Sequence, residues 1–89
     1  MEQYDNVINE CSKLIQSIHK QKNIHILKND DEMLGKYKQL EFLVYVRRAV
    51  ANTNINKFFE ALEDYSKAQE IKPEDLEIKE NMKKLKMKL

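Results

Sequence analysis

Two histidines, His19 and His25, are the first candidates for chemistry, because an imidazole can bind a metal or transfer a proton. They lie six residues apart, and no cysteine stands beside either of them. Zinc sites need three or four ligands at recognisable spacings such as HExxH, and this pair does not supply them. We therefore predict no metal centre and expect ordinary exposed histidines, with an adventitious metal site as the alternative.

Cys11 is the only cysteine of the chain. It falls on an apolar stripe, so we expect a buried core thiol rather than a nucleophile. A single cysteine cannot form an intrachain disulfide, which favours a reducing compartment. We expect a cytoplasmic location.

The remaining reactive side chains do not form a recognisable catalytic set. Glu10 and Asp64 are predicted to face solvent on separate helices, so we do not expect a catalytic carboxylate pair. Phe58, Phe59 and Tyr65 could stack on bases, but their helical spacing favours core packing. With one glycine in 89 residues, the chain has no glycine-rich phosphate loop. We predict that the protein is not an enzyme and needs no cofactor.

The charge balance argues against two classes of partner. Sixteen basic and fifteen acidic residues give a net charge of +1, unlike the basic footprint of a nucleic-acid binder. No apolar run approaches the length of a membrane span. We expect neither nucleic acid nor a membrane as partner. The basic run Lys83-Lys84-x-Lys86-x-Lys88 is expected to complement a helix dipole, with binding to anionic lipid or nucleic acid as the alternative.

An internal repeat organises the chain. The first copy is Tyr4-x2-Val7-Ile8-x-Glu10-Cys11-Ser12-Lys13-Leu14, and it returns 54 residues later as Phe58-x2-Ala61-Leu62-x-Asp64-Tyr65-Ser66-Lys67-Ala68. Repeats of this size are typical of stacked helical units that bury their faces only against neighbours.

Apolar residues at steps of three and four predict a single all-α domain, 1–89, of about four helices in antiparallel hairpins. We expect helices at 3–21, 31–53, 55–71 and 74–89, with 22–30 as a connector. Asn52-Thr53-Asn54 and Pro73 are the expected breaks. The run Phe42–Val46 is apolar all round, which favours a helix covered on more than one side, with a buried strand as the alternative.

The spacing Ala61-x3-Tyr65-x7-Pro73 resembles the second half of a tetratricopeptide repeat. At the positions of the first half stand Tyr45, Arg48, Ala49 and Asn52. The resemblance implies that 3–21 is the second helix of a partial repeat, 31–53 and 55–71 the last repeat, and 74–89 a solvating helix, so that the chain is a fragment of a longer array. It also implies a structural core of Tyr4, Val7, Cys11, Tyr45, Ala49, Phe58, Ala61, Tyr65, Ala68 and Pro73.

Within that family, three segments resemble the C-terminal repeats of co-chaperone-type dynein axonemal assembly factors: Asn9-Glu10-Cys11-Ser12-Lys13-Leu14, Tyr45-Val46-Arg47-Arg48-Ala49 and Ala61-Leu62-Glu63-Asp64-Tyr65. In chaperone-binding members, a clamp of Lys, Asn and Arg residues grips the acidic tail of Hsp70/Hsp90. The clamp spacing Lys-x3-Arg falls here on Leu43 and Arg47, so only the arginine matches.

The resemblance implies a protein-interaction module, an adaptor or co-chaperone scaffold that binds Hsp70/Hsp90 or a client protein during dynein assembly. The candidate partner-binding residues are Lys36, Leu43, Arg47 and Arg48. A surface or ion-paired role is the alternative for Arg47, and a structural role is the alternative for Arg48. The competing hypothesis is a self-associating helical bundle that forms a homodimer through the face left open by the cut array.

Overall fold

The computed structural model of the chain describes residues 2–27 and 31–89, with side chains from 4 to 24 and from 32 to 89. These residues form four helices: α1 (Glu2–Leu27), α2 (Asp31–Asn54), α3 (Phe58–Ile71) and α4 (Leu76–Met87). No strand occurs in the described part of the chain. The all-α prediction is therefore confirmed.

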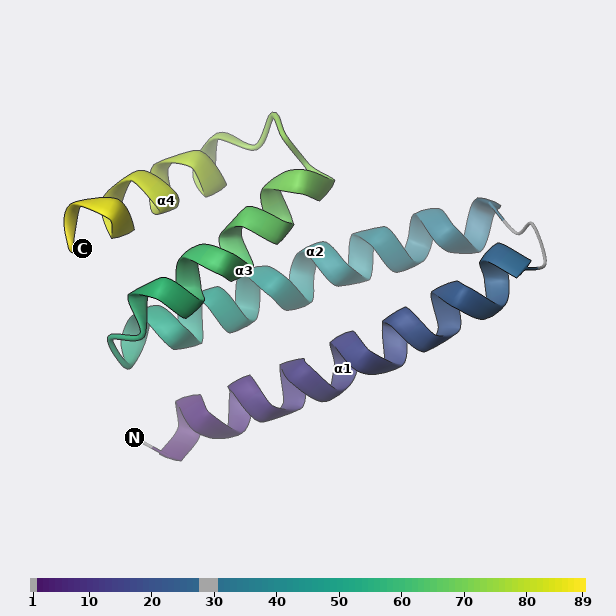
Figure 1. The fold of residues 1–89 in the computed structure, drawn as a ribbon, viewed down its shortest axis with the longest axis horizontal. Coiled ribbons are helices and arrows are strands. Elements are labelled where there is room, and N and C mark those ends of the chain that lie inside the picture. The colour runs from purple at the N-terminus through teal and green to yellow at the C-terminus, as the bar shows by residue number, and fades with distance from the viewer. Residues whose placement is uncertain (1, 28–30) are drawn as a thin grey trace.

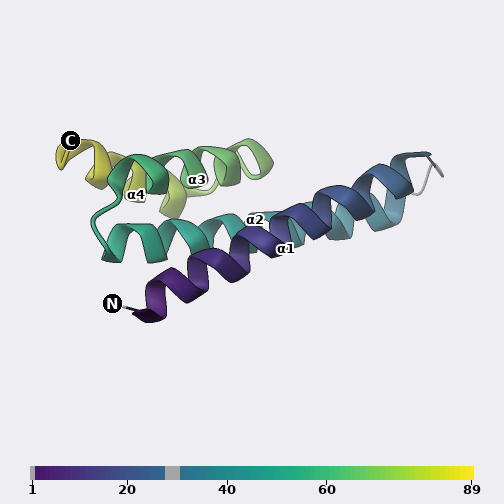
Figure 2. The same cartoon turned by 60° about the horizontal axis from the view of Figure 1, so that its bottom comes forward.

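The helices pack in chain order, each against the next. α2 runs back along α1, and α3 turns back along α2 on the side away from α1 (Figure 1). α4 packs on α3, and Figure 2 shows α3 and α4 together on one side of α2, while α1 crosses in front of α2. The backbone measures 43 × 31 × 14 Å. Since one helix with its side chains is about 10 Å wide, the molecule is close to a single layer of helical hairpins.

The first helix is longer than the sequence predicted. α1 continues to Leu27, so the expected connector at 22–30 is wrong over its first six residues, and residues 28–30 lie outside the described part. Asn23 costs a helix only a few tenths of a kcal/mol relative to better helix formers. Lys22, one residue earlier, is anchored on α2 through Glu41. This tertiary contact outweighs the weak local preference for a turn.

Small residues hold α2 and α3 together. Ala49, Ala61 and Ala68 have no exposed surface, and they lie in one cluster with the buried rings of Tyr45 and Tyr65. Alanine side chains let two helix backbones approach closely, so the larger residues can interdigitate around them. The other buried members of this cluster are Ile15, Phe42, Ile78 and Leu85. The segment Phe42–Val46 is helical, which excludes the buried strand.

A tight turn joins α2 to α3. α2 ends at Asn54, close to the expected end, but α3 begins only at Phe58 rather than at residue 55. Asn56 adopts a positive φ of 65°, a conformation that asparagine tolerates better than most residues. The Lys57 amide donates to the Asn52 carbonyl at 2.8 Å and closes the turn.

The α3–α4 connection follows the expected stop at Pro73. α3 ends at Ile71, and Pro73 lies exposed in the turn that follows. Asp75 is the N-cap of α4, where its Oδ1 accepts a hydrogen bond from the Ile78 amide at 3.1 Å. The helix therefore begins at Leu76, slightly later than residue 74, because the cap residue itself is not helical.

This cap gives the first testable prediction. Asp75→Ala is expected to lower the free energy of unfolding by about 1 kcal/mol, since it leaves a first-turn amide without its partner. Chemical denaturation followed by circular dichroism measures the change. Glu74→Ala, one residue earlier and without a cap hydrogen bond, is the matched control. Equal losses in the two variants would contradict a capping role for Asp75.

Candidate functional site

A groove lined mainly by apolar side chains lies between the first half of α1 and the second half of α2. We call it the α1–α2 groove, and its volume is about 480 Å³. Its lining is apolar except for one arginine, and consists of Tyr4, Val7, Leu43, Val46, Arg47, Val50 and Ala51. The groove is open to solvent along one face of α2.

An exposed stripe on α2 forms one wall of this groove. Lys36, Leu40, Leu43, Arg47 and Val50 follow one another at steps of three and four, so they share one face of the helix. All five are exposed, and Leu43 retains 53% of its accessible surface. Three of the five are apolar, and exposed apolar side chains grouped on one helix face are typical of a binding face. The expectation that α2 is covered on several sides therefore holds for Phe42 and Tyr45 and fails for Leu43.

The sequence-predicted residues Lys36, Leu43 and Arg47 thus lie on one helix face, and two of them line the groove. Arg47 forms no ion pair or hydrogen bond with any described residue. Lys36 stands about 16 Å from Arg47 along the helix axis, at 1.5 Å per residue.

Arg48, in contrast, points into the fold. Its Nε donates to both carboxylate oxygens of Asp64 at 3.0 Å, and its Nη2 donates to Oδ1 at 2.6 Å. Nη1 donates to the Ser12 hydroxyl at 3.0 Å. The Asn52 amide completes the network with a 3.1 Å hydrogen bond to Asp64 Oδ2. Arg48 is therefore part of a hydrogen-bond network that joins α1, α2 and α3. This arrangement fits the structural role for Arg48 better than the partner-binding role.

The expectation that Asp64 faces solvent is wrong. Asp64 retains only 3% of its accessible surface, whereas Glu10, its equivalent in the repeat, is exposed as expected. Burial of a carboxylate is tolerable only with charged and hydrogen-bonding partners, and Arg48 and Asn52 supply them. The hydrogen bonds that Arg48 donates to Asp64 in turn raise the pKa of its guanidinium. The two acids are far from equivalent, because only the second copy of the repeat has an arginine opposite it.

Cys11 lies beside this network and is buried. Desolvation raises the pKa of its thiol, although Arg47 and Arg48 oppose the effect. A thiol with a raised pKa is a poor nucleophile at neutral pH. This agrees with the expected core role.

The other predicted core residues divide into three groups. Tyr45, Ala49, Ala61, Tyr65 and Ala68 are buried as expected. Tyr4, Val7 and Phe58 are half-buried, and Pro73 is exposed. Phe59 was expected in the core but is 68% exposed, because it lies on the face of α3 opposite the buried alanines.

His19 belongs to a cluster that the sequence did not predict. Its Nε2 lies 3.2 Å from Oε2 of Glu41, and the Lys22 ammonium donates to Glu41 Oε1 at 2.6 Å. Glu41 is buried, and its signal in the sequence was its place on the same helix face as Tyr45 and Arg48. The side chain of His25 lies outside the described part. No metal-binding group of His, Cys, Asp or Glu occurs among the side chains that are described.

The site is thus an open apolar groove with one arginine, Arg47, that has no ion-pair partner among the described residues. Its arrangement suits binding, and the fold that carries it is an all-α set of helical hairpins. No protein-family model, curated protein or solved structure matches the chain. None of the described helices has the length and hydrophobicity needed to cross a membrane.

Proposed function

We propose that the chain is a protein-interaction module of the tetratricopeptide type, an adaptor that binds a partner protein in the α1–α2 groove. The observation that carries this proposal is the apolar lining of that groove, with Leu43 and Val50 half-exposed at its wall. Apolar surface of this kind gains free energy when a partner removes it from water. The lone cysteine favours the cytoplasm as the place where this happens.

The occupant we propose is an amphipathic helix with an acidic residue opposite Arg47. The groove lies between two helices, so a third helix can pack its side-chain ridges along it. Arg47 lies within the lining, and a partner that covered it without a countercharge would leave a desolvated cation. An aspartate or glutamate in the partner removes this cost and selects the partner at the same time.

A differential pull-down tests the groove. Leu43→Asp places a charge in the apolar wall, whereas Phe59→Asp places the same charge at an exposed aromatic on α3. Used as baits, the wild-type chain and the Phe59→Asp variant are expected to retain the partner protein, and Leu43→Asp is expected to lose about tenfold in affinity or more. Retention of the same protein by both variants would contradict the groove as the binding site.

The finer proposal is a co-chaperone role in the assembly of axonemal dynein. It rests on the resemblance of the two segments around Arg47 and Ala61, and on the exposed position of Arg47. A peptide carrying the acidic C-terminal tail of Hsp70/Hsp90 is expected to bind the chain, and Arg47→Ala is expected to weaken it about tenfold. If the tail peptide does not bind, the co-chaperone role is wrong while the groove proposal stands.

The second candidate function is self-association, which the exposed Leu40, Leu43 and Val50 favour. A second copy of the chain would cover the same apolar residues of α2. Unlike the proposed partner helix, it is not chosen for an acidic residue opposite Arg47. Sedimentation over a wide range of concentrations separates the two functions. Dimerisation that Leu43→Asp abolishes would support self-association, and a monomer throughout would exclude it.

A further inference from the structure

A second cavity lies on a different surface, where α1, α2 and the end of α3 meet. Its volume is about 310 Å³, and none of its lining residues belongs to the α1–α2 groove. Glu41 is one of them, but both of its carboxylate oxygens are already engaged, by Lys22 and by His19. Glu41 therefore does not repel a further anion as strongly as a lone carboxylate would.

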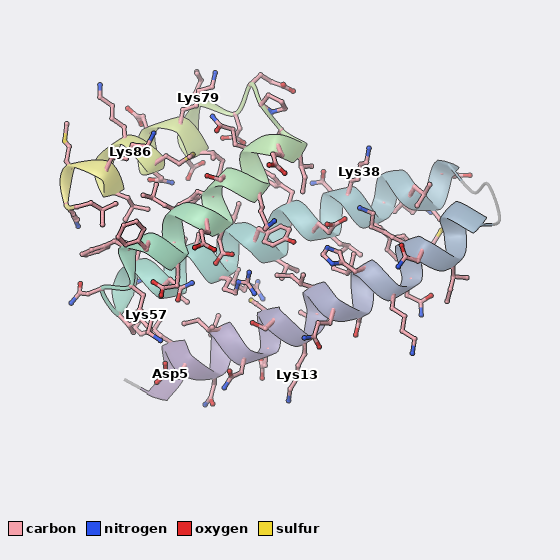
Figure 3. All side chains as sticks on the ribbon, viewed as in Figure 1. Asp5, Lys13, Lys38, Lys57, Lys79 and Lys86 are labelled. Carbon is pink, nitrogen blue, oxygen red and sulfur yellow. The ribbon has the colours of Figure 1, made fainter. Side chains whose placement is uncertain are left out.

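The unpaired charges of this cavity are mainly cationic. Lys38 from α2 and Lys67 from α3 both line it, and neither forms an ion pair or hydrogen bond with another described residue. Figure 3 shows Lys38 extending from α2 away from α1, toward the side where α3 lies. Glu70 is the remaining carboxylate of the lining. Two cations and one anion leave an excess of one positive charge.

Tyr45 adds a neutral donor to the same cavity. Its ring is buried in the core, and the residue also lines the cavity. Desolvation raises the pKa of its hydroxyl, and the charges of Glu41 and Glu70 raise it further. The hydroxyl therefore stays protonated and can donate a hydrogen bond to an anion.

We propose that this cavity binds one carboxylate, presented as an Asp or Glu side chain of a partner protein. The excess of one positive charge matches a monoanion, whereas a phosphate monoester would leave a net negative charge. The volume stands at the lower limit of ligand sites and suits one or two side chains rather than a long segment. Lys38 and Lys67 hold the carboxylate from two helices, and the Tyr45 hydroxyl donates a hydrogen bond to it.

This site goes beyond the proposed groove and does not depend on it. The groove binds an apolar helix face, and the cavity binds a charged group with little apolar contact. A partner that used both would be anchored on two surfaces of one domain, and its two contacts would add in free energy. Failure of either site leaves the other unaffected.

The test is an NMR titration of the whole chain at low ionic strength with a capped peptide, acetyl-Gly-Glu-Gly-amide. We expect shifts at Lys38, Tyr45 and Lys67, and none at Leu43. The double variant Lys38→Gln/Lys67→Gln is expected to weaken binding about tenfold. The control Lys13→Gln/Lys79→Gln removes the same two charges at exposed positions outside the cavity, where Figure 3 shows Lys13 extending from α1 away from α2, and it is expected to change binding by less than about twofold.

Three outcomes would overturn the proposal. The uncharged peptide with Gln in place of Glu could give the same shifts, which would exclude recognition of the carboxylate. If both double variants bound the peptide equally weakly, the loss of affinity would come from the lower net charge of the chain and not from the cavity. Tighter binding of inorganic phosphate than of the peptide would assign the cavity to another ligand. Because all four lysines are exposed, the variants are expected to keep the helical content of the wild type.

Discussion

Replacing Asp64 by alanine is expected to lower the free energy of unfolding by about 3 kcal/mol, the lower end of the range for breaking a buried ion pair. The reason is the cation that stays behind. Arg48 has about four-fifths of its side chain buried, and three of its hydrogen bonds end on Asp64. Without that carboxylate the guanidinium is desolvated and keeps one hydrogen bond, to Ser12, and its place over the Tyr45 ring, 5.7 Å from the ring centroid. Urea denaturation followed by circular dichroism measures the loss as a shift of the midpoint.

Glu63→Ala is the matched control, because Glu63 is the exposed acid next to Asp64 on α3. It is expected to change stability by less than about 0.5 kcal/mol. The double variant Arg48→Met/Asp64→Leu removes both charges together and is expected to recover most of the stability lost in Asp64→Ala. If Asp64→Ala were as stable as Glu63→Ala, the network could not be what joins α1, α2 and α3.

Replacing Tyr65 by alanine is expected to cost about 3 kcal/mol as well, but for a different reason. The ring is 4% exposed and lies in the core cluster, with Leu85 of α4 beside it. Its removal opens a cavity where α3 meets the last helix. We expect a lower thermal midpoint of unfolding. We also expect α4 to lose its helical structure at a lower temperature than the other three helices.

Phe59→Ala serves as the control for this variant. Both changes replace an aromatic residue by alanine in the same helix, but Phe59 is largely exposed. Its replacement is expected to be nearly neutral, since alanine also favours the helix. Tyr65→Phe, which keeps the ring, is expected to retain most of the stability. Comparable losses of stability in Phe59→Ala and Tyr65→Ala would contradict the burial of Tyr65 and the exposure of Phe59.

The arrangement of helices could be predicted from the sequence because it depends on local signals. The steps of three and four in the apolar stripes, Asn52 and Asn54 in the last turn of α2, and Pro73 after α3 each act on the chain nearby. The alanines at 49, 61 and 68 were identified by the repeat spacing, and the structure buries all three.

The interhelical contacts could not be predicted in the same way. The sequence predicts Asp64 to be a surface acid, because nothing in its own helix shows that Arg48 lies opposite it. The length of α1 was underestimated for a similar reason, since its last turns depend on the contact between Lys22 and Glu41. Buried ion pairs join residues far apart in the chain, and a stripe pattern carries no information on such pairs.

The candidate groove falls between these two cases. The predicted pair Leu43 and Arg47 does share one helix face, as its four-residue spacing requires. The contribution of Tyr4 and Val7 from α1 became visible only in the structure. Lys38 and Lys67, which line the second cavity, carried no sequence signal of a site.

The most direct test of the central claim is a selection of helical peptides from a random library on the wild-type chain and on Arg47→Glu. We predict that the wild type enriches amphipathic peptides with an acidic residue, and that Arg47→Glu enriches peptides with a basic residue at the same place. Lys79→Glu, which makes the same change on α4, is expected to leave the preference unchanged. Enrichment without an acidic residue, or the same peptides on all three chains, would contradict binding in the α1–α2 groove.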